Sequence, residues 1–272
     1  MDNASYLAKK NRFGNMLTIY GRKPVLEALE DSSIPIHAIH FADSNKTAAI
    51  LGRIEQLAEQ RSITVNFMDK RALSRISRNS KQDQGVAADL ALPDYQQLDN
   101  FMANYSASKH DRFLAVDKVS NPQNLGMIIR SAAAAGIRGL VVPEQGSAAM
   151  GPLVIKASAG AIFKCPIIRC QQLADALTAL QSQQVAIASL AMQEQADQNT
   201  CTGKQISLYE LMHREPHATV FILGNETEGV SKQTQRQADY SVYIPMHNEV
   251  ESLNVAVTAA LIAYAVTKPI NR

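Results

Sequence analysis

Residues 243–262, Tyr-Ile-Pro-Met-His-Asn-Glu-Val-Glu-Ser-Leu-Asn-Val-Ala-Val-Thr-Ala-Ala-Leu-Ile, combine an apolar segment, a polar turn and an Ala-rich segment. The apolar segment that ends at Ile244 predicts a strand, and residues 253–267 predict a helix that can pack closely against another helix. Ser252 stands where the residue that caps this helix is expected. Asn254 is a polar residue in the first turn of a very apolar helix, and we interpret it either as a capping residue or as an active-site group.

A second strand end lies upstream, where the predicted strand 219–223 runs into the turn Gly-Asn-Glu-Thr-Glu-Gly at 224–229. The two glycines have the spacing of a phosphate-binding loop, but Val230-Ser231 stands where that loop has Lys followed by Ser or Thr. Glu226 and Glu228 would also repel a phosphate. This turn therefore excludes a nucleoside triphosphate site and favours a ligand with neutral or cationic groups.

A third strand end, which starts at Asp117, passes through a turn rich in Pro and Asn into a helix. Asn124 lies near the start of this helix, and Gly126 permits close approach of a neighbouring backbone. Arg130 lies six residues beyond Asn124, so the two side chains can flank one cavity without sharing a helical stripe. Because a buried arginine is costly unless it is paired, we expect Arg130 either to form a salt bridge or to face a pocket.

Short apolar segments alternate with helical segments after residue 111, which predicts an α/β fold with a mostly parallel sheet covered on both faces. Ligands of such sheets bind at the carboxyl ends of the strands, where the three segments above lie. The predicted strands are 113–117, 139–142, 166–169, 185–190, 219–223 and 241–244. The predicted helices are 125–135, 152–159, 171–182, 227–237 and 253–267.

The composition divides the chain into a polar tail at 1–16, a small α/β unit at 17–92, a polar linker at 93–110 and the larger unit at 111–272. The small unit is predicted to open with a helix that has Pro24 in its first turn. Its other predicted elements are a helix at 47–60 and strands at 36–41, 63–67 and 86–90.

The small unit carries the excess of positive charge. Residues 1–92 contain 13 basic and 10 acidic residues, whereas the remainder contains 14 and 15. The excess is concentrated in Lys70, Arg71, Arg75, Arg78 and Lys81, and the three arginines fall on one stripe if this segment is helical. The stripe is interpreted either as a solvated surface or as a contact for a phosphate backbone.

Several classes of protein are disfavoured by what the sequence lacks. The longest apolar segment, residues 255–266, is too short to cross a bilayer, and the first twenty residues lack the apolar centre of a secretory signal. The cysteines, Cys165, Cys170 and Cys201, form no CxxC pair and have no histidine at a ligand-like spacing. We therefore expect no metal site, no membrane span and a location in the cytoplasm.

The three strand ends together resemble the motifs of the SpoU/TrmH branch of the SPOUT RNA methyltransferases. The motifs are N-x-G-x-x-x-R at 124–130, G-x-E-x-x-G at 224–229, and I-P-M followed by S-L-N-V within 244–255. The resemblance covers residues 111–272, and residues 17–92 resemble the family's RNA substrate-binding domain. Two residues depart from the pattern: Asn248 replaces a usual Gly, which Asn can imitate because it tolerates positive φ, and Asp83 replaces a usual His.

The resemblance implies a deep trefoil knot, formed where the last strand and helix thread through a loop, with S-adenosylmethionine bound in the knot. The residues that it implies for cofactor contact are Gly224, Asn225, Ile244, Met246 and Leu253. The residues that it implies for the reaction site are Asn124, Arg130, Glu226, Ser252 and Asn254. The family's enzymes are homodimers whose knots pack together, which would account for the Ala-rich last helix.

The implied reaction transfers a methyl group to a ribose 2′-hydroxyl of structured RNA, either ribosomal RNA, with a large-subunit guanosine as a candidate target, or transfer RNA. An activated methyl donor needs no metal. A guanidinium essentially never loses its proton, so we interpret Arg130 as a cationic clamp on the developing alkoxide, oriented by Asn124. The resemblance also favours the Lys70–Lys81 stripe as an RNA contact.

Two alternative functions are an RNA-binding factor and an oxidoreductase. A catalytically weak RNA-binding or ribosome-assembly factor could retain the same fold, but the intact polar residues of the three motifs argue against it. A nucleotide-dependent oxidoreductase on a doubly wound sheet is contradicted by the absence of a G-x-G-x-x-G motif.

Overall fold

The structure is a computed structural model, which describes residues 16–32, 34–45, 48–77, 80–91, 95–191, 205–215 and 217–267. The chain separates into two compact units, residues 1–94 and residues 95–272. The tail expected at 1–16 lies outside the described residues except for Met16, as do Arg78 and Cys201.

The N-terminal unit is built on a four-stranded mixed sheet with the order β1-β4-β2-β3. β2 pairs with β3 in parallel and with β4 in antiparallel orientation, and β1 pairs antiparallel with β4. The strands are β1 (Met16–Tyr20), β2 (Ile36–Ala42), β3 (Thr64–Met68) and β4 (Val86–Ala91). Strand β1 was not expected, since the helix with Pro24 was predicted to open this unit. The hydrogen bonds that make this five-residue segment a strand come from β4, some seventy residues later, so the local sequence does not indicate it.

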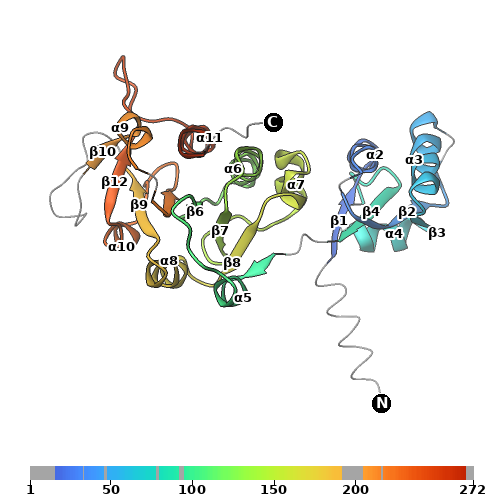
Figure 1. Ribbon diagram of the computed structural model, residues 1–272. Helices are drawn as coiled ribbons and strands as arrows, with labels where there is room; N and C mark the ends of the chain where they lie inside the picture. The colour runs from blue at the N-terminus through green and yellow to red at the C-terminus, as the bar shows by residue number, and fades with distance from the viewer. Residues whose placement is uncertain are drawn as a thin grey trace. The chain divides into compact units, whose positions relative to one another are not determined.

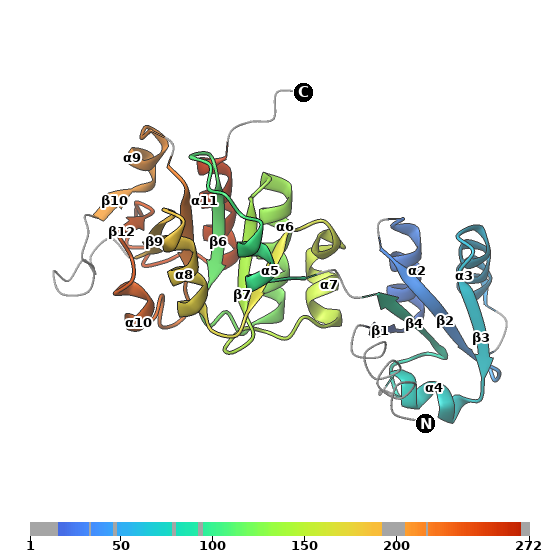
Figure 2. The same cartoon turned by 60° about the horizontal axis from the view of Figure 1, so that its bottom comes forward.

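The described part of this unit also contains three helices, of which α2 (Arg22–Glu30) and α3 (Ala49–Gln60) pack side by side (Figure 1). The third, α4 (Lys70–Ser77), follows β3 and buries Leu73 against Ala42 and Ala87 of the sheet. Leu73 is buried, whereas Lys70, Arg71 and Arg75 of α4 are exposed. Figure 2 shows α4 after the end of β3.

The C-terminal unit contains an eight-stranded sheet with the order β10-β12-β9-β11-β6-β7-β8-β5. Every pairing in this sheet is parallel, which confirms the expected mostly parallel α/β fold. The strands are β5 (Gln96–Gln97), β6 (Arg112–Val116), β7 (Gly139–Pro143), β8 (Ile167–Cys170), β9 (Ala186–Leu190), β10 (Gln205–Ser207), β11 (Thr219–Leu223) and β12 (Tyr240–Tyr243).

Helices cover both faces of this sheet, with α6, α7 and α11 on one face and α5 and α8 on the other (Figure 1). Central strands such as β7 and β11 are buried along their whole length, as expected for strands covered on both sides. The helices are α5 (Leu98–Ala103), α6 (Pro122–Ala135), α7 (Pro152–Ser158), α8 (Leu173–Ser182), α9 (Leu208–Met212), α10 (Lys232–Gln235) and α11 (Val255–Val266), with a short 3-10 helix, η1 (Ala161–Phe163). None of the helices that the structure describes is long and apolar enough to span a membrane.

The helix expected at 227–237 is wrong over its first half. Residues 224–229 form a tight turn, closed by a backbone bridge between Asn225 and Gly229, and α10 begins only at Lys232. Ser231 caps α10 by accepting a hydrogen bond from Thr234 N. The short elements β10 and α9 were also not expected, because segments of three and five residues carry too little periodicity to be detected.

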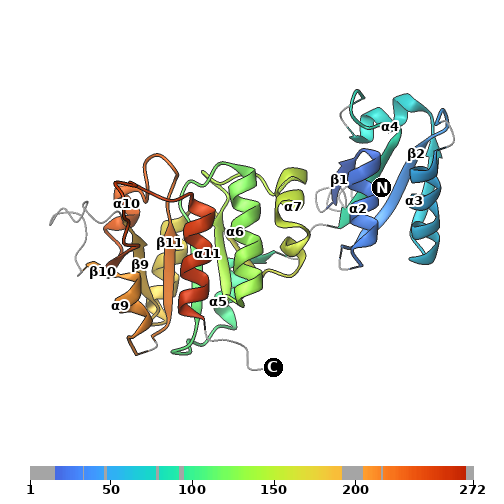
Figure 3. The same ribbon diagram turned by 90° about the horizontal axis from the view of Figure 1, so that it is seen from above.

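The path of the chain after β12 brings its last helix to the centre of the unit. β12 lies on the outer side of β9, yet α11 packs against α6, β6 and β11, so the connection passes back over the sheet edge (Figure 3). α6 in turn approaches α7 closely, because a Cβ on Gly126 would lie 2.4 Å from the Ala157 Cβ. The close approach of α6 to α7 therefore requires glycine at position 126.

Candidate functional site

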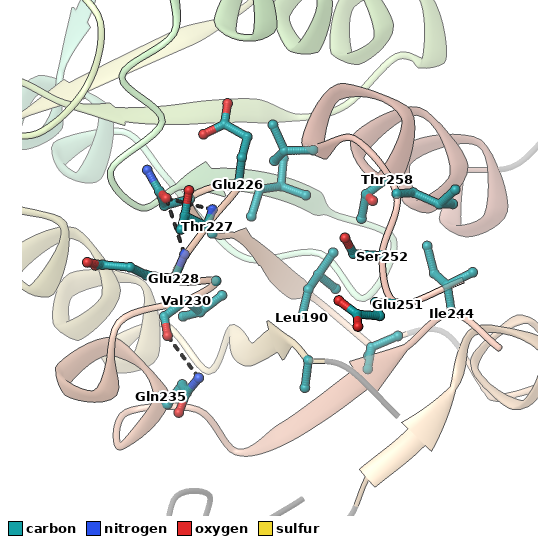
Figure 4. Close-up of a pocket in the computed structure, with 18 of the residues that line it drawn as sticks. Leu190, Glu226, Thr227, Glu228, Val230, Gln235, Ile244, Glu251, Ser252 and Thr258 are labelled. Atoms are coloured by element: carbon teal, nitrogen blue, oxygen red, sulfur yellow. Dashed lines mark hydrogen bonds between the residues drawn. The ribbon is translucent and has the colours of Figure 1, made fainter. Parts of the chain in front are cut away.

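A pocket opens at the carboxyl edge of the parallel sheet, where the strands β9, β11 and β12 end. Its cavity volume is about 140 Å³. One side is formed by the turn after β11, which carries Glu226 and Glu228, and another by the segment before α11, which carries Glu251 and Ser252 (Figure 4). Parallel strands place their carboxyl ends at one edge, so segments that are far apart in sequence meet here.

All five residues that the resemblance implied for cofactor contact line this pocket. They come from the turn after β11, from the segment after β12 and from the segment before α11. They are Gly224, Asn225, Ile244, Met246 and Leu253.

The turn after β11 depends on Gly224 and Asn225. A Cβ on Gly224 would lie 2.1 Å from the carbonyl carbon of Gly229, so only glycine fits where the two sides of the turn cross. Asn225 N donates to Gly229 O at 3.0 Å, and Gly229 N donates back to Asn225 O at 2.9 Å. The Asn225 side chain accepts from Thr227 N at 2.8 Å and donates to Lys118 O at 3.1 Å. Its side chain is therefore used to build the turn, and Asn225 faces the pocket as part of that turn.

A second contact attaches this turn to the neighbouring strand β6. The buried Asp117, the residue after β6, accepts a hydrogen bond from Ser231 N at 2.8 Å, and its own N–H donates to Leu223 O at 2.8 Å. The next residue, Lys118, has a φ of 58°, a left-handed conformation that is rare for a residue other than glycine. No local sequence pattern predicts these hydrogen bonds, because they join residues more than a hundred positions apart.

The three motifs meet in a chain of hydrogen bonds through Asn124. The Asn254 Nδ2 donates to the Asn124 Oδ1 at 3.1 Å, and the Asn124 Nδ2 donates to the Glu226 Oε1. Asn124 is 6% exposed, whereas Glu226 is exposed and lines the pocket. The buried amide thus holds a carboxylate at the pocket and connects it to the start of α11.

The capping residue of α11 is Asn254 and not Ser252, so that expectation is wrong. The Asn254 Oδ1 accepts a hydrogen bond from Ala256 N at 2.8 Å, and the helix begins at Val255. The capping interpretation of Asn254 is confirmed, and the same side chain also donates to Asn124, whereas its role as an active-site group stays a prediction. Ser252, which is exposed, lines the pocket instead.

Of the implied reaction site, Glu226 and Ser252 line the pocket, and Asn124 and Asn254 are joined to Glu226 by hydrogen bonds, whereas Arg130 does neither. It is exposed on α6 and forms no hydrogen bond or ion pair with any described residue, so neither alternative expected for it is observed. Asn124 does not orient it, because the Asn124 amide is engaged by Glu226 and Asn254. The role of Arg130 in a reaction stays a prediction.

The electrostatic character of the pocket is negative. Three carboxylates, those of Glu226, Glu228 and Glu251, line it, and no Lys, Arg or His is among its described lining residues. The expected preference of this turn for neutral or cationic ligands rested on the first two of these residues. Glu251, which follows the I-P-M segment, was missed, although its position beside Ser252 could have indicated it.

Other lining residues were also missed by the sequence analysis. Leu190 and Ala191 could have been found from the rule that ligands bind at strand ends, because they end β9. Gln235 of α10 and Thr258 of α11 carried no such signal. The Gln235 Nε2 donates to Val230 O at 2.8 Å, which attaches α10 to the turn.

The carboxylates of the pocket do not converge on a metal site. No group of three or more His, Cys, Asp or Glu residues that could hold a metal ion occurs within the described residues. Burial raises the pKa of the Cys165 thiol to about 12 and that of the Cys170 thiol to about 11, so neither is a thiolate at neutral pH.

In the N-terminal unit, the basic residues of the expected stripe are exposed on and after α4. Lys70, Arg71, Arg75 and Lys81 form no ion pair within the described part of the chain, and Arg78 lies outside it. Asp69, the acidic residue in this segment, accepts hydrogen bonds from Ala72 N and Arg71 N, which lower the pKa of its carboxyl. The stripe therefore keeps its positive charge on the surface.

The two departures from the family pattern are both accommodated. Asn248 has a φ of 57°, the conformation for which glycine is usually required, and Asn adopts it more readily than most residues. Asp83 is 1% exposed and accepts hydrogen bonds from the Ser77 Oγ at 3.1 Å and from Gly85 N at 3.0 Å.

Comparison with known proteins identifies matching families for both units. Residues 111–264 match the model of the SpoU rRNA methylase family, and residues 18–96 match the model described as RNA 2′-O ribose methyltransferase substrate binding. A relative from Xylella fastidiosa, named 23S rRNA (guanosine-2′-O-)-methyltransferase RlmB, is 32% identical over 256 residues, which cover 93% of this chain and 94% of the relative.

Solved structures share the fold. The SpoU methyltransferase AviRb from Streptomyces viridochromogenes aligns with a TM-score of 0.65 at 22% identity, over 95% of this chain and 91% of that one. An AdoMet-bound rRNA methyltransferase from Sinorhizobium meliloti aligns with a TM-score of 0.64 at 20% identity, over 95% of this chain and 89% of that one.

The double role of Asn254 can be tested by stability. We expect Asn254→Ala to lower the free energy of unfolding by ~1 kcal/mol, because it removes the cap of α11. Asn254→Ser should retain most of that energy, since a serine hydroxyl can still accept from Ala256 N although it cannot reach Asn124. Denaturant unfolding followed by circular dichroism would measure both, and equal losses for Ala and Ser would contradict the capping role.

Proposed function

The chain belongs to the SpoU family of RNA methyltransferases, and from this premise we propose that it transfers a methyl group from S-adenosylmethionine to a ribose 2′-hydroxyl of ribosomal RNA. The observation that carries this proposal is the meeting of three carboxylates and no cation in a pocket beside the Asn254–Asn124–Glu226 chain.

The chemistry of the pocket fits S-adenosylmethionine. A sulfonium is a permanent cation, and the carboxylates of Glu226, Glu228 and Glu251 favour a cation while they disfavour the phosphates of ATP or NAD. Backbone and apolar groups of the lining suit an adenosine. We assign the holding of the cofactor to Gly224, Asn225, Ile244, Met246 and Leu253.

The cofactor supplies a methyl group that is already activated, so the protein's task is to align a ribose hydroxyl and to accept its proton. Glu226 is the proposed acceptor, because its carboxylate lines the pocket and the Asn124 amide fixes its orientation. Ser252 donates or accepts a hydrogen bond to the ribose from the opposite side of the pocket. Asn254 keeps Asn124 in the single orientation that presents Nδ2 to Glu226.

Arg130 keeps its proton under all physiological conditions, so the proton of the hydroxyl goes elsewhere. Its proposed role is that of a cationic clamp on the developing alkoxide and the adjacent phosphate. Its exposed position on α6 and its lack of a partner among the described residues leave its charge free to meet an anionic substrate.

RNA is the proposed substrate, and the N-terminal unit is its binding domain. The domain match and the exposed basic residues Lys70, Arg71, Arg75 and Lys81 support this assignment. A guanosine of large-subunit ribosomal RNA is the proposed target, by analogy with the name of the Xylella relative. Such a reaction belongs in the cytoplasm, where ribosomal RNA of bacteria is made.

The same family assignment leads us to propose the trefoil knot. The return of the chain from β12 over the sheet edge to α11 supports it, because a path of this kind can carry the last helix through the loop that precedes β12. The pocket is then enclosed by segments 223–230, 242–246 and 251–258 of the knotted region.

A homodimer is also proposed, with α11 at its interface. Val257, Leu261 and Tyr264 are 48%, 42% and 60% exposed and lie on one face of this helix, at i, i+4 and i+7. Met127 on the adjoining helix α6 is 41% exposed. A contiguous exposed apolar face of this kind is typical of a subunit contact.

Transfer from radiolabelled S-adenosylmethionine to large-subunit ribosomal RNA tests the proposed reaction. We expect Glu226→Gln to reduce the rate by ~10²–10⁴-fold, because it removes the proton acceptor but keeps the shape of the side chain. Glu228→Gln is the matched control, since it removes the same charge from the same pocket, and its effect should be smaller than tenfold, about 1.4 kcal/mol.

If the two substitutions lowered the transfer rate equally, Glu226 would not be the proton acceptor. Its carboxylate would then contribute only its negative charge to the pocket. Binding of S-adenosylmethionine to the natural chain without transfer to any RNA would favour the catalytically weak RNA-binding factor. Mapping of 2′-O-methyl groups in RNA from cells with and without the protein would identify the target nucleotide.

The RNA role of α4 can be tested by charge reversal. The double substitution R71E/R75E should weaken binding of a large-subunit ribosomal RNA transcript and lower the slope of log K against log salt by about 1.5, as expected when two phosphate contacts are lost. R53E on α3, away from the stripe, is the control. Unchanged affinity at low salt would refute the contact.

The dimer can be tested by light scattering coupled to gel filtration. We expect the natural chain to have twice its monomer mass of 29.7 kDa, and Leu261→Lys to have the monomer mass, because a buried lysine disfavours the contact. Phe67→Lys, which changes a residue 62% exposed in the other unit, should remain dimeric. A natural chain of monomer mass would contradict the proposal.

A further inference from the structure

A second concave site lies wholly within the N-terminal unit, at the carboxyl end of β2. Four segments that are distant in sequence form it: the start of α2, the connection from β2 to α3, the start of α4 and the loop before β4. Its cavity volume is about 700 Å³. Its lining residues include Arg22, Asn45, Lys70, Lys81, Gln84 and Gly85.

Two hydrogen bonds to Gln84 hold Arg22 in this site, one from its guanidinium Nε and one from its backbone N–H. Its Nε donates to Gln84 O at 3.1 Å, and its backbone N–H donates to the Gln84 Oε1 at 3.2 Å. Its terminal nitrogens, Nη1 and Nη2, donate to no described residue, and the side chain is half-buried. The guanidinium is therefore fixed in place while its two terminal NH₂ groups stay available, which is the arrangement that binds phosphate oxygens in pairs.

The base of the site is rigid. The Asn45 Nδ2 donates to Gly85 O at 2.8 Å, and Ala42 N donates to the same oxygen at 2.9 Å. Gly85 has a φ of 78°, and a Cβ on it would lie 1.9 Å from the Asn45 Oδ1, so no other residue fits there. Gln84, which anchors Arg22, is itself in the left-handed region with a φ of 52°. The backbone is thus constrained to present Gln84 to Arg22.

The charge of the site is positive. Arg22, Lys70 and Lys81 line it, and the one acidic lining residue, Asp83, is buried and accepts two hydrogen bonds from the protein. Lys70 and Lys81 are exposed and form no ion pair within the described residues. The site therefore combines one anchored guanidinium with two exposed ammonium groups, and it contrasts with the carboxylate-lined pocket of the C-terminal unit.

We propose that this site binds a backbone phosphate of the RNA substrate, with Arg22 as its paired donor and Lys70 and Lys81 on the phosphates to either side. The inference rests on the proposed RNA methyltransferase function and adds a site to it, because Arg71 and Arg75 of the stripe do not line the site. A polynucleotide is favoured over a free phosphate because three cationic side chains line the site, more than one phosphate needs, and because the unit matches an RNA methyltransferase substrate-binding model.

The test compares Arg22→Gln with Lys23→Gln, adjacent substitutions that remove the same charge. Lys23 is exposed and does not line the site. Binding of a large-subunit ribosomal RNA transcript is measured by filter retention across a salt series. We expect R22Q to weaken binding at least tenfold more than K23Q and to lower the salt slope by about 0.7–0.9, the value of one phosphate contact. R22K should recover only part of the loss, because lysine keeps the charge but not the fork.

Equal losses for R22Q and K23Q would overturn the proposal, since only general charge would then matter. Inorganic phosphate that binds the natural chain in an Arg22-dependent way, without any Arg22 effect on the transcript, would overturn the RNA assignment. If thermal unfolding shows that R22Q does not fold, Lys81→Gln replaces it under the same criterion, because Lys81 is exposed and engages no described residue in an ion pair.

The two proposals fail separately. Calorimetric titration with S-adenosylmethionine and the methyl-transfer assay, performed on the natural chain, test the reaction and do not involve Arg22. Loss of RNA binding in R22Q with normal cofactor binding supports the site. A natural chain that transfers no methyl group, but whose RNA binding depends on Arg22, would overturn the reaction and leave the phosphate site in place.

Discussion

The candidate site depends on one buried amide. Asn124 uses its oxygen to accept from Asn254 and its nitrogen to donate to Glu226, so its amide can take only one of its two orientations. A buried polar group that is fully satisfied on both sides defines a geometry, whereas a half-satisfied one would cost free energy. The start of α6, the turn after β11 and the start of α11 must therefore lie together for any of them to be stable in this arrangement.

The topology makes this meeting possible. β11 is inserted between β9 and β6, although β7 and β8 intervene in sequence, so the turn after β11 lies next to the connection from β6 to α6. Asp117 and Lys118 at the end of β6 hold that turn through Ser231 and Asn225. The return of the chain from β12 then brings Asn254 to the same edge. Parallel strands and one crossing connection are thus sufficient to unite motifs that are 130 residues apart.

The sequence predicted those features that depend on local pattern, and it missed those that depend on distant partners. Alternating apolar segments indicated the parallel sheet, and the family resemblance implied the five pocket residues from Gly224 to Leu253. The cap of α11 was misplaced by two residues, because Ser252 and Asn254 are both good caps and the choice is made by Asn124, which belongs to another helix. The position of the Arg22 side chain could not be predicted, because the residue that holds it, Gln84, is 62 residues away.

The two pockets carry opposite charges, and under the proposed function this gives each unit a separate task. A pocket that favours a sulfonium through Glu226, Glu228 and Glu251 also repels the phosphate backbone that must reach it. Energy for bringing RNA to this pocket must come from groups that do not line it, and remote contacts can supply such energy without weakening the cofactor site. The fixed Arg22 and the exposed lysines of the N-terminal unit have the required charge and lie in a separate unit of the chain. A single pocket could not attract both a sulfonium and the RNA phosphates, whereas two units of opposite charge can.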